Sequence, residues 1–234
     1  MILFVTGTGT DVGKTHVSCA LLSAVRTAAP GLHIQAWKPV LTGIPPLDAR
    51  SGEATDRDRH AAHLALTPPA PAHAFGPPIS PHLAAREAGV RLCVHRLATA
   101  ALRHAEGTDV LLIEGAGGLF SPIADDTTHA DLAGILRARI GDRLRLLLVA
   151  PDRLGVLHDL RSTLLAARHV GVPITALALS APALPDASTG RNAGEVDQLL
   201  LGPLAAVFPR ARPDDPVSAV AAVRTWTRLG LELG

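Results

Sequence analysis

The sequence predicts an α/β protein with a mainly parallel sheet, and three observations lead to this class. Short apolar runs alternate along the chain with segments of helical periodicity. The runs are mostly apolar and do not alternate with polar residues, which is typical of strands buried on both faces of a parallel sheet. The chain also opens with a strand, a glycine-rich loop and a helix. With 234 residues, 47% of them hydrophobic, it can form one α/β domain spanning residues 1–234.

Strands and helices follow one another from the amino terminus. The predicted strands are Ile2 to Thr6, His33 to Trp37, Val110 to Glu114, Arg145 to Ala150, Pro173 to Leu179 and a weak one at Ala205 to Phe208. Helical patterns cover Lys14 to Ala28, Leu92 to Ala105, Val156 to His169 and Gly194 to Leu201. Two long segments, Thr67 to Pro81 and Ser180 to Arg191, are predicted to be irregular loops. Parallel sheets bind ligands at the carboxyl ends of their strands, so the residues after each strand are site candidates.

The first of these loops has the features of a phosphate-binding loop. It reads Gly7-Thr8-Gly9-Thr10-Asp11-Val12-Gly13-Lys14-Thr15. Backbone N–H groups and the start of the next helix form an anion site, where Lys14 reaches the β/γ-phosphates and the Thr15 hydroxyl binds Mg²⁺. Counted from Gly7, the loop is one residue longer than the usual pattern. Its Gly-Lys-Thr ending favours a phosphate site over a simple turn.

Lysine usage marks a second candidate. Of the 22 basic residues only two, Lys14 and Lys38, are lysines. A lysine supplies a compact ammonium where the planar fork of arginine would not fit. Lys38 follows the second predicted strand, and Pro39 after it favours extended backbone that carries the side chain off the strand end. We therefore predict a functional Lys38 rather than a solvated surface residue.

The third strand ends at Glu114, directly before Gly115-Ala116-Gly117-Gly118. A carboxylate at this edge suits an Mg²⁺ ligand or a water-holding acid beside a triphosphate. The alternative is an acid that caps a helix.

Composition excludes several classes of function. A net charge of +1 without a basic stripe, and 3% aromatic residues with no Tyr, argue against nucleic acid. A signal peptide and a membrane-spanning run are not expected, which favours the cytoplasm. Cys19 and Cys93 are unclustered and are predicted to be packing thiols. His60 and His63 lie three residues apart on a probable helix but lack a third ligand, so we expect both to be structural residues that are exposed or partly buried.

Taken together, these residues resemble one family. The resemblance rests on the phosphate loop with the Phe4-Val5-Thr6 strand before it, Lys38-Pro39-Val40-x-Thr42-Gly43, Ser80-Pro81-His82, Glu114-Gly115-Ala116-Gly117-Gly118 and Asp152-Arg153-Leu154-Gly155. These segments look like dethiobiotin synthetase, the penultimate enzyme of biotin synthesis, whose own loop is of the long form. The resemblance thins after Leu179.

The resemblance implies a doubly wound P-loop nucleoside triphosphate hydrolase fold and an ATP-dependent cyclo-ligase. The reaction would convert 7,8-diaminononanoate and CO₂ to the cyclic urea dethiobiotin. A carbamate would attack the γ-phosphate, and the second amine would displace phosphate from the mixed anhydride. Such chemistry needs positioning and charge neutralisation more than covalent catalysis.

The resemblance also implies site residues. Catalysis would use Thr10, Lys14 and Lys38. The nucleotide would be bound by Asp11, Val12, Gly13, Lys14, Thr15, His16, Asp56, Glu114, Gly115, Ala116, Gly117, Ser180 and Pro209. The substrate would be bound by Thr10, Lys38, Thr42, Ser80, Gly117, Gly155, Val156, Leu157 and His158. The last four begin a helix that would meet the diamine's carboxylate across a homodimer, with His158 in place of an expected amide.

Mg²⁺ would be held by Thr15, Glu114 and Asp56, with Asp58 as the alternative aspartate. Two other functions remain open. One is a partition or septum-placement ATPase, against which the absence of a second lysine early in the loop argues. The other is a cobalamin-pathway amidoligase domain. Such enzymes usually carry a separate amidotransferase module, for which this chain has no room. The family's adenine-reading Asn-Asp pair is replaced here by Ser180-Ala181, so other nucleoside triphosphates are predicted substrates alongside ATP.

Overall fold

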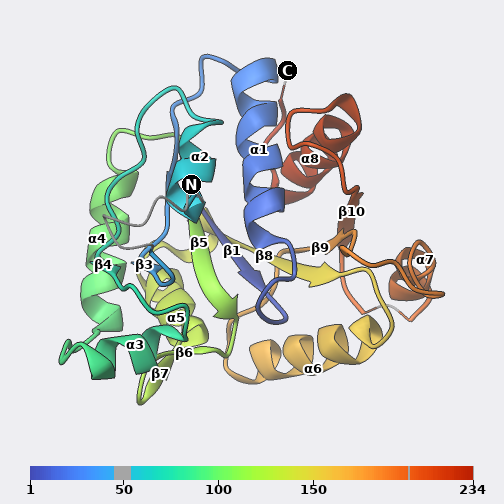
Figure 1. Cartoon of the computed structure of the whole chain (residues 1–234). Helices are drawn as coiled ribbons and strands as arrows, with labels where there is room; N and C mark the ends of the chain where they lie inside the picture. Colours follow the sequence, from blue (N-terminus) through green and yellow to red (C-terminus); the bar gives the residue numbers. More distant parts are fainter. Residues whose placement is uncertain (45–53, 200, 234) are drawn as a thin grey trace.

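The computed structural model describes residues 1–44, 54–199 and 201–233. Its centre is a six-stranded sheet in the order β10-β9-β8-β1-β5-β2, in which every neighbouring pair is parallel (Figure 1). The strands are β1 (Ile2–Gly7), β2 (Ile34–Trp37), β5 (Val110–Gly118), β8 (Leu144–Pro151), β9 (Ala176–Ser180) and β10 (Leu204–Phe208). The predicted parallel sheet is confirmed.

Helices cover both faces of this sheet because alternate strand residues point to opposite sides. Leu3 and Val5 pack with α1 (Lys14–Ala28) and α8 (Pro216–Leu229). Ile2 and Phe4 belong to the opposite cluster, with α4 (Val94–Ala105) and α5 (His129–Ile140). On the β8–β9 side, α6 (Val156–His169) and α7 (Asn192–Gln198) complete the second layer. The fold is therefore a doubly wound α/β sheet.

Burial explains why the strands lack polar alternation. All six residues of β1 are buried, and so are the apolar residues of β5 from Val110 to Ile113. Each fully buried Leu, Ile or Val stabilises the folded state by about 1.5–3 kcal/mol relative to an exposed one. Because the strands bury apolar side chains on both faces, the same strands stabilise both helical layers. Trp226 of α8 adds a hydrogen bond of 3.0 Å from its indole nitrogen to the Leu21 carbonyl of α1.

Smaller elements lie around the sheet. The helix α2 (Asp56–Ala61) packs beside α1, α3 (Pro81–Glu87) lies near β6 (Pro122–Ala124), and a 3₁₀ turn spans Gly141–Arg143. Two short pairs form, one between β3 (Val40–Leu41) and β4 (His73–Ala74) and one between β6 and β7 (Thr127–Thr128). No helix in the described parts of the chain is long and apolar enough to cross a membrane.

Some predicted boundaries were wrong. The segment 67–81 is not wholly irregular, because β4 pairs with β3 inside it. The strand predicted from residue 173 begins at Ala176, and β5 continues past Glu114 to Gly118. The helix predicted over 194–201 spans Asn192–Gln198. These errors arise where strand pairing or helix packing, and not the local pattern, sets the end.

Candidate active site

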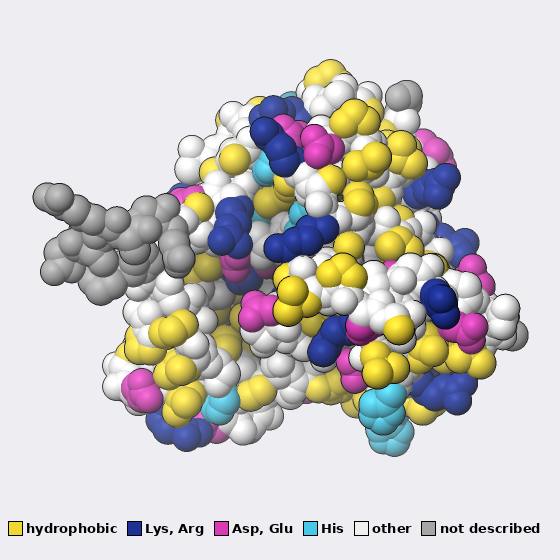
Figure 2. All heavy atoms as spheres, turned by 45° about the vertical axis from the view of Figure 1, so that its right-hand side comes forward, with side chains coloured by type: hydrophobic (Ala, Val, Ile, Leu, Met, Phe, Trp, Pro, Cys, Tyr) yellow, Lys and Arg dark blue, Asp and Glu magenta, His cyan; other side chains and the backbone are white. Residues whose placement is uncertain are grey.

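The carboxyl ends of β1, β2 and β5 meet at one edge of the sheet and form a cleft of about 370 Å³. The first strand leads into the phosphate loop, the second into Lys38, and the third carries Glu114. The cleft is lined by Thr10, Asp11, Gly13, Lys14, Thr15, His16, Lys38, Val40, Thr42, Asp56, Arg59, Glu114, Ala116 and Gly117. On the face drawn in Figure 2, basic side chains lie among acidic and apolar ones and form no continuous patch.

The phosphate loop wraps tightly against its surroundings. Gly13, at the start of α1, has φ 94°, and an added Cβ would lie 2.2 Å from the Ser180 hydroxyl oxygen, so only glycine fits. The Lys14 ammonium donates to the Gly9 carbonyl at 2.8 Å. Burial, together with the positive charge of Lys38, lowers the pKa of Lys14 to about 8. The lysine predicted to reach phosphates thus lies within the loop that it would serve.

Three oxygen-bearing side chains and an ammonium converge beside the loop. The Thr15 hydroxyl lies 2.9 Å from Asp56 Oδ1 and 2.8 Å from Glu114 Oε1, and its single hydrogen serves one of them at a time. Lys38 Nζ donates to Glu114 Oε1 at 2.7 Å and pairs with Asp56 Oδ2. The two carboxylates therefore share one cation.

In this cluster the attraction between opposite charges outweighs the effect of burial on the pKa values. Burial alone would raise the pKa of Glu114, which is 0% exposed, but the Lys38 ammonium and the His60 hydrogen bond hold that pKa well below its usual range. Burial also opposes the charge on Lys38, whereas the Glu114 and Asp56 carboxylates outweigh it and raise the pKa of the ammonium. Both groups are thus charged at neutral pH.

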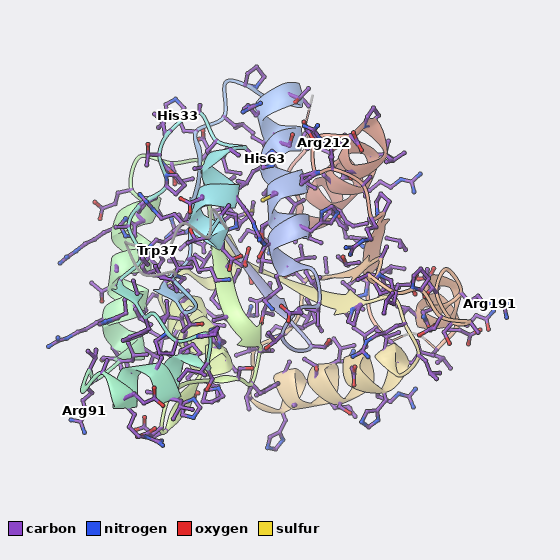
Figure 3. The ribbon with its side chains drawn as sticks, in the orientation of Figure 1. His33, Trp37, His63, Arg91, Arg191 and Arg212 are labelled. Atoms are coloured by element: carbon purple, nitrogen blue, oxygen red, sulfur yellow. The ribbon has the colours of Figure 1, made fainter. Side chains whose placement is uncertain are left out.

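His60 is more deeply buried than the sequence suggested. The prediction of surface or partly buried structure for the His60 and His63 pair is wrong for His60, which is 1% exposed and whose Nε2 donates to Glu114 Oε2 at 2.9 Å. His63 lies beside α1 (Figure 3), and the carbonyl of the preceding Ala62 accepts from Arg26 Nη1 of that helix at 3.3 Å. Among the described residues, no group of three His, Cys, Asp or Glu side chains forms a conventional metal cluster.

The two candidate aspartates of α2 have different surroundings. Asp56 faces the cleft. Asp58 instead caps the helix, since its Oδ2 accepts from the Thr55 backbone at 2.9 Å and from the Thr55 hydroxyl at 2.7 Å. The Asp58 carboxylate is thus engaged with Thr55, and Asp58 does not line the cleft.

The glycine-rich end of β5 is fixed by a histidine that the sequence did not single out. His129 Nε2 accepts from the Ala116 N–H at 3.0 Å, and its Nδ1 donates to the Ser121 carbonyl at 3.0 Å. This pair of bonds requires the neutral ring, and burial lowers the pKa of His129 to about 4. Gly115 lies so close that an added Cβ would be 3.0 Å from the ring.

A second hollow of about 570 Å³ continues from the phosphate loop toward β9 and β10. Ser180 and His16 line it, and His16 Nε2 donates to the Pro209 carbonyl at 3.0 Å. Arg153 and Arg210 also line it, and the sequence had indicated neither as a nucleotide-contacting side chain. Their position near the loop follows from the ends of β8 and β10 lying on the same side of the sheet.

Other predicted site residues lie apart from the cleft. Ser80 stands before α3, where its hydroxyl contacts His82 Nδ1 at 3.0 Å, and it is not among the described residues that line the cleft. Gly155 begins α6, and the segment from Gly155 to His158 likewise does not line the cleft of this chain.

Cys19 is buried and Cys93 half-buried, and both thiols are free.

The donor set fits a divalent cation. Thr15, Asp56 and Glu114 offer hard oxygen donors around one point, and the Lys38 ammonium shows that this point attracts a positive charge. Such donors are the ones that Mg²⁺ prefers in proteins.

A doubly wound parallel sheet whose first strand leads through a Gly-Lys-Thr loop into a helix defines the class of P-loop phosphate-binding proteins. Solved structures agree with this fold: a ParA family ATPase from Chlorobium tepidum has TM-score 0.52 at 14% identity, covering 97% of this chain and 90% of its own. A MinC:MinD cell division complex from Aquifex aeolicus has TM-score 0.56 at 12% identity, covering 98% and 95%. At such identity the likeness shows the fold alone.

Sequence comparison narrows the class. A family model described as an AAA domain matches residues 2–219. The ATP-dependent dethiobiotin synthetase BioD of Caulobacter sp. strain K31 is 40% identical over 185 residues, covering 76% of this chain and 75% of the relative. The enzyme of the same name from Rhodopirellula baltica is 40% identical over 192 residues, covering 76% and 72%. The chain belongs to the dethiobiotin synthetase family.

Proposed function

We propose that this protein catalyses the Mg-ATP-dependent ring closure of 7,8-diaminononanoate with CO₂ to dethiobiotin. The observation that carries the proposal is the buried Lys38, which lies in the same cleft as the phosphate loop and between the carboxylates of Asp56 and Glu114. Membership of the dethiobiotin synthetase family supports the same reaction.

The reaction needs three bond-forming steps. One amine of the substrate adds to CO₂ and loses a proton, which gives a carbamate. A carbamate oxygen attacks the γ-phosphorus of ATP, and ADP leaves, so that a carbamic-phosphoric anhydride forms. The second amine attacks the carbamate carbon and displaces phosphate, which closes the urea ring. The protein's part is to align these groups and to neutralise charge.

The residues of the cleft suit these roles. Lys14, already inside the phosphate loop, would neutralise charge on the transferring phosphoryl group. Lys38 would hold the carbamate beside the γ-phosphate, a task for a compact ammonium. Thr10, Thr42 and Gly117, which line the cleft, would position the diamine or its carbamate.

Thr15, Asp56 and Glu114 would hold the divalent cation, and Asp56 is preferred to Asp58 because Asp58 is engaged as a helix cap. When bound there, Mg²⁺ would neutralise charge on the nucleotide phosphates. An ammonium and a divalent cation cannot occupy the same pair of carboxylates, so Lys38 would leave them as the site fills. Its side chain would then be free to turn toward the substrate.

A homodimer would complete the substrate site. Gly155 has φ 94° at the start of α6. The Val156 and His158 N–H groups already donate to the Arg153 and Gly155 carbonyls, at 3.2 and 3.1 Å, so a carboxylate would be attracted by the Leu157 N–H and by the positive end of the helix dipole. Because this end lies apart from the cleft in one chain, we propose that it serves the cleft of a second copy. Ser80 also lies apart from the cleft in one chain, so it would contact the substrate only when the two copies are assembled in this way.

Product analysis tests the proposal. The full chain is incubated with 7,8-diaminononanoate, ¹³C-bicarbonate and Mg-ATP, and dethiobiotin is sought by mass spectrometry. We expect dethiobiotin that carries the label in its ring carbonyl, with one ADP formed per product. Reactions without diamine, and with Lys38→Met in place of the wild type, serve as controls. Binding of ATP without any labelled dethiobiotin would reject the proposed reaction.

A further inference from the structure

The two oxygens of Glu114 have different partners. Oε1 faces the cleft, 2.8 Å from the Thr15 hydroxyl and 2.7 Å from Lys38 Nζ. Oε2 points the other way and accepts from His60 Nε2 at 2.9 Å. Glu114 is 0% exposed and His60 is 1% exposed, so no solvent competes for this bond. One oxygen of the carboxylate is therefore fixed and the other is presented to the cation.

Helix α2 brings His60 to this place. Asp56 is the first residue of the helix and His60 lies four residues later, so the two side chains share one face about one turn apart. The capping box between Thr55 and Asp58 fixes where the helix starts. The same short helix thus supplies one carboxylate to the cation site and supports the other from behind.

The ring of His60 is costly to bury at this position. Its Nδ1 is inaccessible to solvent and has no hydrogen-bond partner in the described part of the chain. An unpartnered buried nitrogen destabilises the folded state, whereas an apolar side chain of similar size would not. Packing alone does not account for a histidine here. The bond to Glu114 is what an apolar residue would lack.

We propose that His60 is a positioning residue of the cation site, which sets the rotation of the Glu114 carboxylate so that Oε1 points at the metal. The inference rests on the proposed function for the metal and nucleotide, but not on the identity of the substrate. The terminal torsion of a glutamate has no sharp preference of its own, so an outer hydrogen bond decides its orientation. Outer partners of this kind tune metal affinity.

The test compares variants by metal affinity rather than by turnover. Mn²⁺ binding to the full-length chain is measured by electron paramagnetic resonance in the presence of saturating ADP. Nucleotide affinity without metal is measured in EDTA. His60→Leu removes the donor, whereas His60→Gln keeps an amide N–H that can replace Nε2. His63→Leu, a change of the neighbouring half-buried histidine, is the matched control.

His60→Leu should weaken Mn²⁺ binding by about tenfold to a hundredfold. Its ADP affinity in EDTA should stay within about twofold of the wild type, because the phosphate loop is untouched. His60→Gln should regain most of the metal affinity, and His63→Leu should change neither quantity. If His60→Leu does not fold, His60→Met, which also fills the space without a donor, replaces it.

Several results would overturn the inference: unchanged Mn²⁺ affinity in the donor-free variant, an equal loss in His60→Leu and His60→Gln, or no Mn²⁺ binding by the wild type. The equal loss would mean that α2 is disturbed and that the donor is irrelevant. Failure of the proposed function is read separately, because absence of dethiobiotin from a wild type that binds Mn-ADP leaves this inference standing.

Discussion

Lys38→Met removes the only ammonium that the two cleft carboxylates share in the described part of the chain. Lys38 Nζ lies 2.7 Å from Glu114 Oε1 and pairs with Asp56 Oδ2. Methionine fills a similar volume but carries no charge. Glu114, which is 0% exposed, is then left beside Asp56 without a cation. We expect the fold to lose stability when no metal is present.

The magnitude follows from burial. Removing one partner of a buried ion pair typically costs about 3–5 kcal/mol. The Asp56 side chain is 26% exposed, so water screens part of the remaining charge, and we expect the lower end, about 3 kcal/mol. For a chain of this size 1 kcal/mol shifts Tm by about 2–4 °C, so Lys38→Met should lower Tm by about 6–12 °C in EDTA.

A divalent cation should reverse most of this loss because it restores positive charge between the carboxylates. Thermal unfolding of wild type and variant is therefore measured at pH 7.5 in EDTA and in Mg²⁺. Arg59→Met is the matched control. The Arg59 side chain is 57% exposed and its Nη1 lies 4.0 Å from Asp56 Oδ1, and such surface ion pairs contribute at most about 1 kcal/mol to stability.

Lys38→Arg separates charge from shape. It should keep most of the stability and the nucleotide affinity yet lose most turnover, because a planar guanidinium does not replace the ammonium beside a carbamate. The reasoning is refuted if the free energy of unfolding of Lys38→Met in EDTA lies within about 1 kcal/mol of the wild-type value. It is also refuted if Mg²⁺ leaves the difference between the two proteins unchanged.

Three further predictions concern the rest of the site. Asp56→Asn and Glu114→Gln should each raise the Mg²⁺ concentration needed for activity, whereas Asp58→Asn should instead weaken the cap of α2, by about 0.5–2 kcal/mol in urea unfolding; a metal effect of Asp58→Asn would show that the register is wrong. His129 has a pKa lowered to about 4 by burial. The pKa of a histidine in the unfolded chain is about 6.5, so the unfolded state takes up a proton first as pH falls. The neutral ring therefore contributes about 3 kcal/mol to the free energy of unfolding, which is fully present above about pH 6.5 and lost as pH falls toward about 4. His129→Gln should therefore flatten urea-measured stability across that range, and an unaltered slope would contradict the prediction. Because Ser180 replaces an amide, competition between ATP, GTP and CTP should show less than about hundredfold preference for ATP, and a larger preference would point to a base reader such as Arg210.

Local sequence signals predicted the elements that depend on local physics. Helices α1 and α6 have the predicted bounds, Lys14–Ala28 and Val156–His169, since each follows a glycine and carries a continuous apolar stripe. The five main strands were predicted because burial on both faces leaves mostly apolar runs, in which polar residues such as Gln35 and Arg145 are isolated. The resemblance to the family rested on such contiguous motifs and is confirmed by the relatives.

Several elements were missed, one of them despite a local signal. Helix α8 was not predicted, although Asp215 before Pro216 is a usual start signal. The pairs β3–β4 and β6–β7 are two or three residues long, so their existence depends on the partner strand and not on periodicity. The single-domain organisation and the homodimer stay predictions.

The sequence by itself determined the chemistry available at the sheet edge: a phosphate loop that contains Lys14, a second lysine at Lys38 and a carboxylate at Glu114, each following or ending a predicted strand. Only the tertiary structure decided how they pair. Lys38 meets Glu114 across 76 positions of the chain, and His60 meets it across 54. No local pattern encodes such contacts, because burial of a charge is tolerated only where folding brings an opposite charge and a donor to the same point.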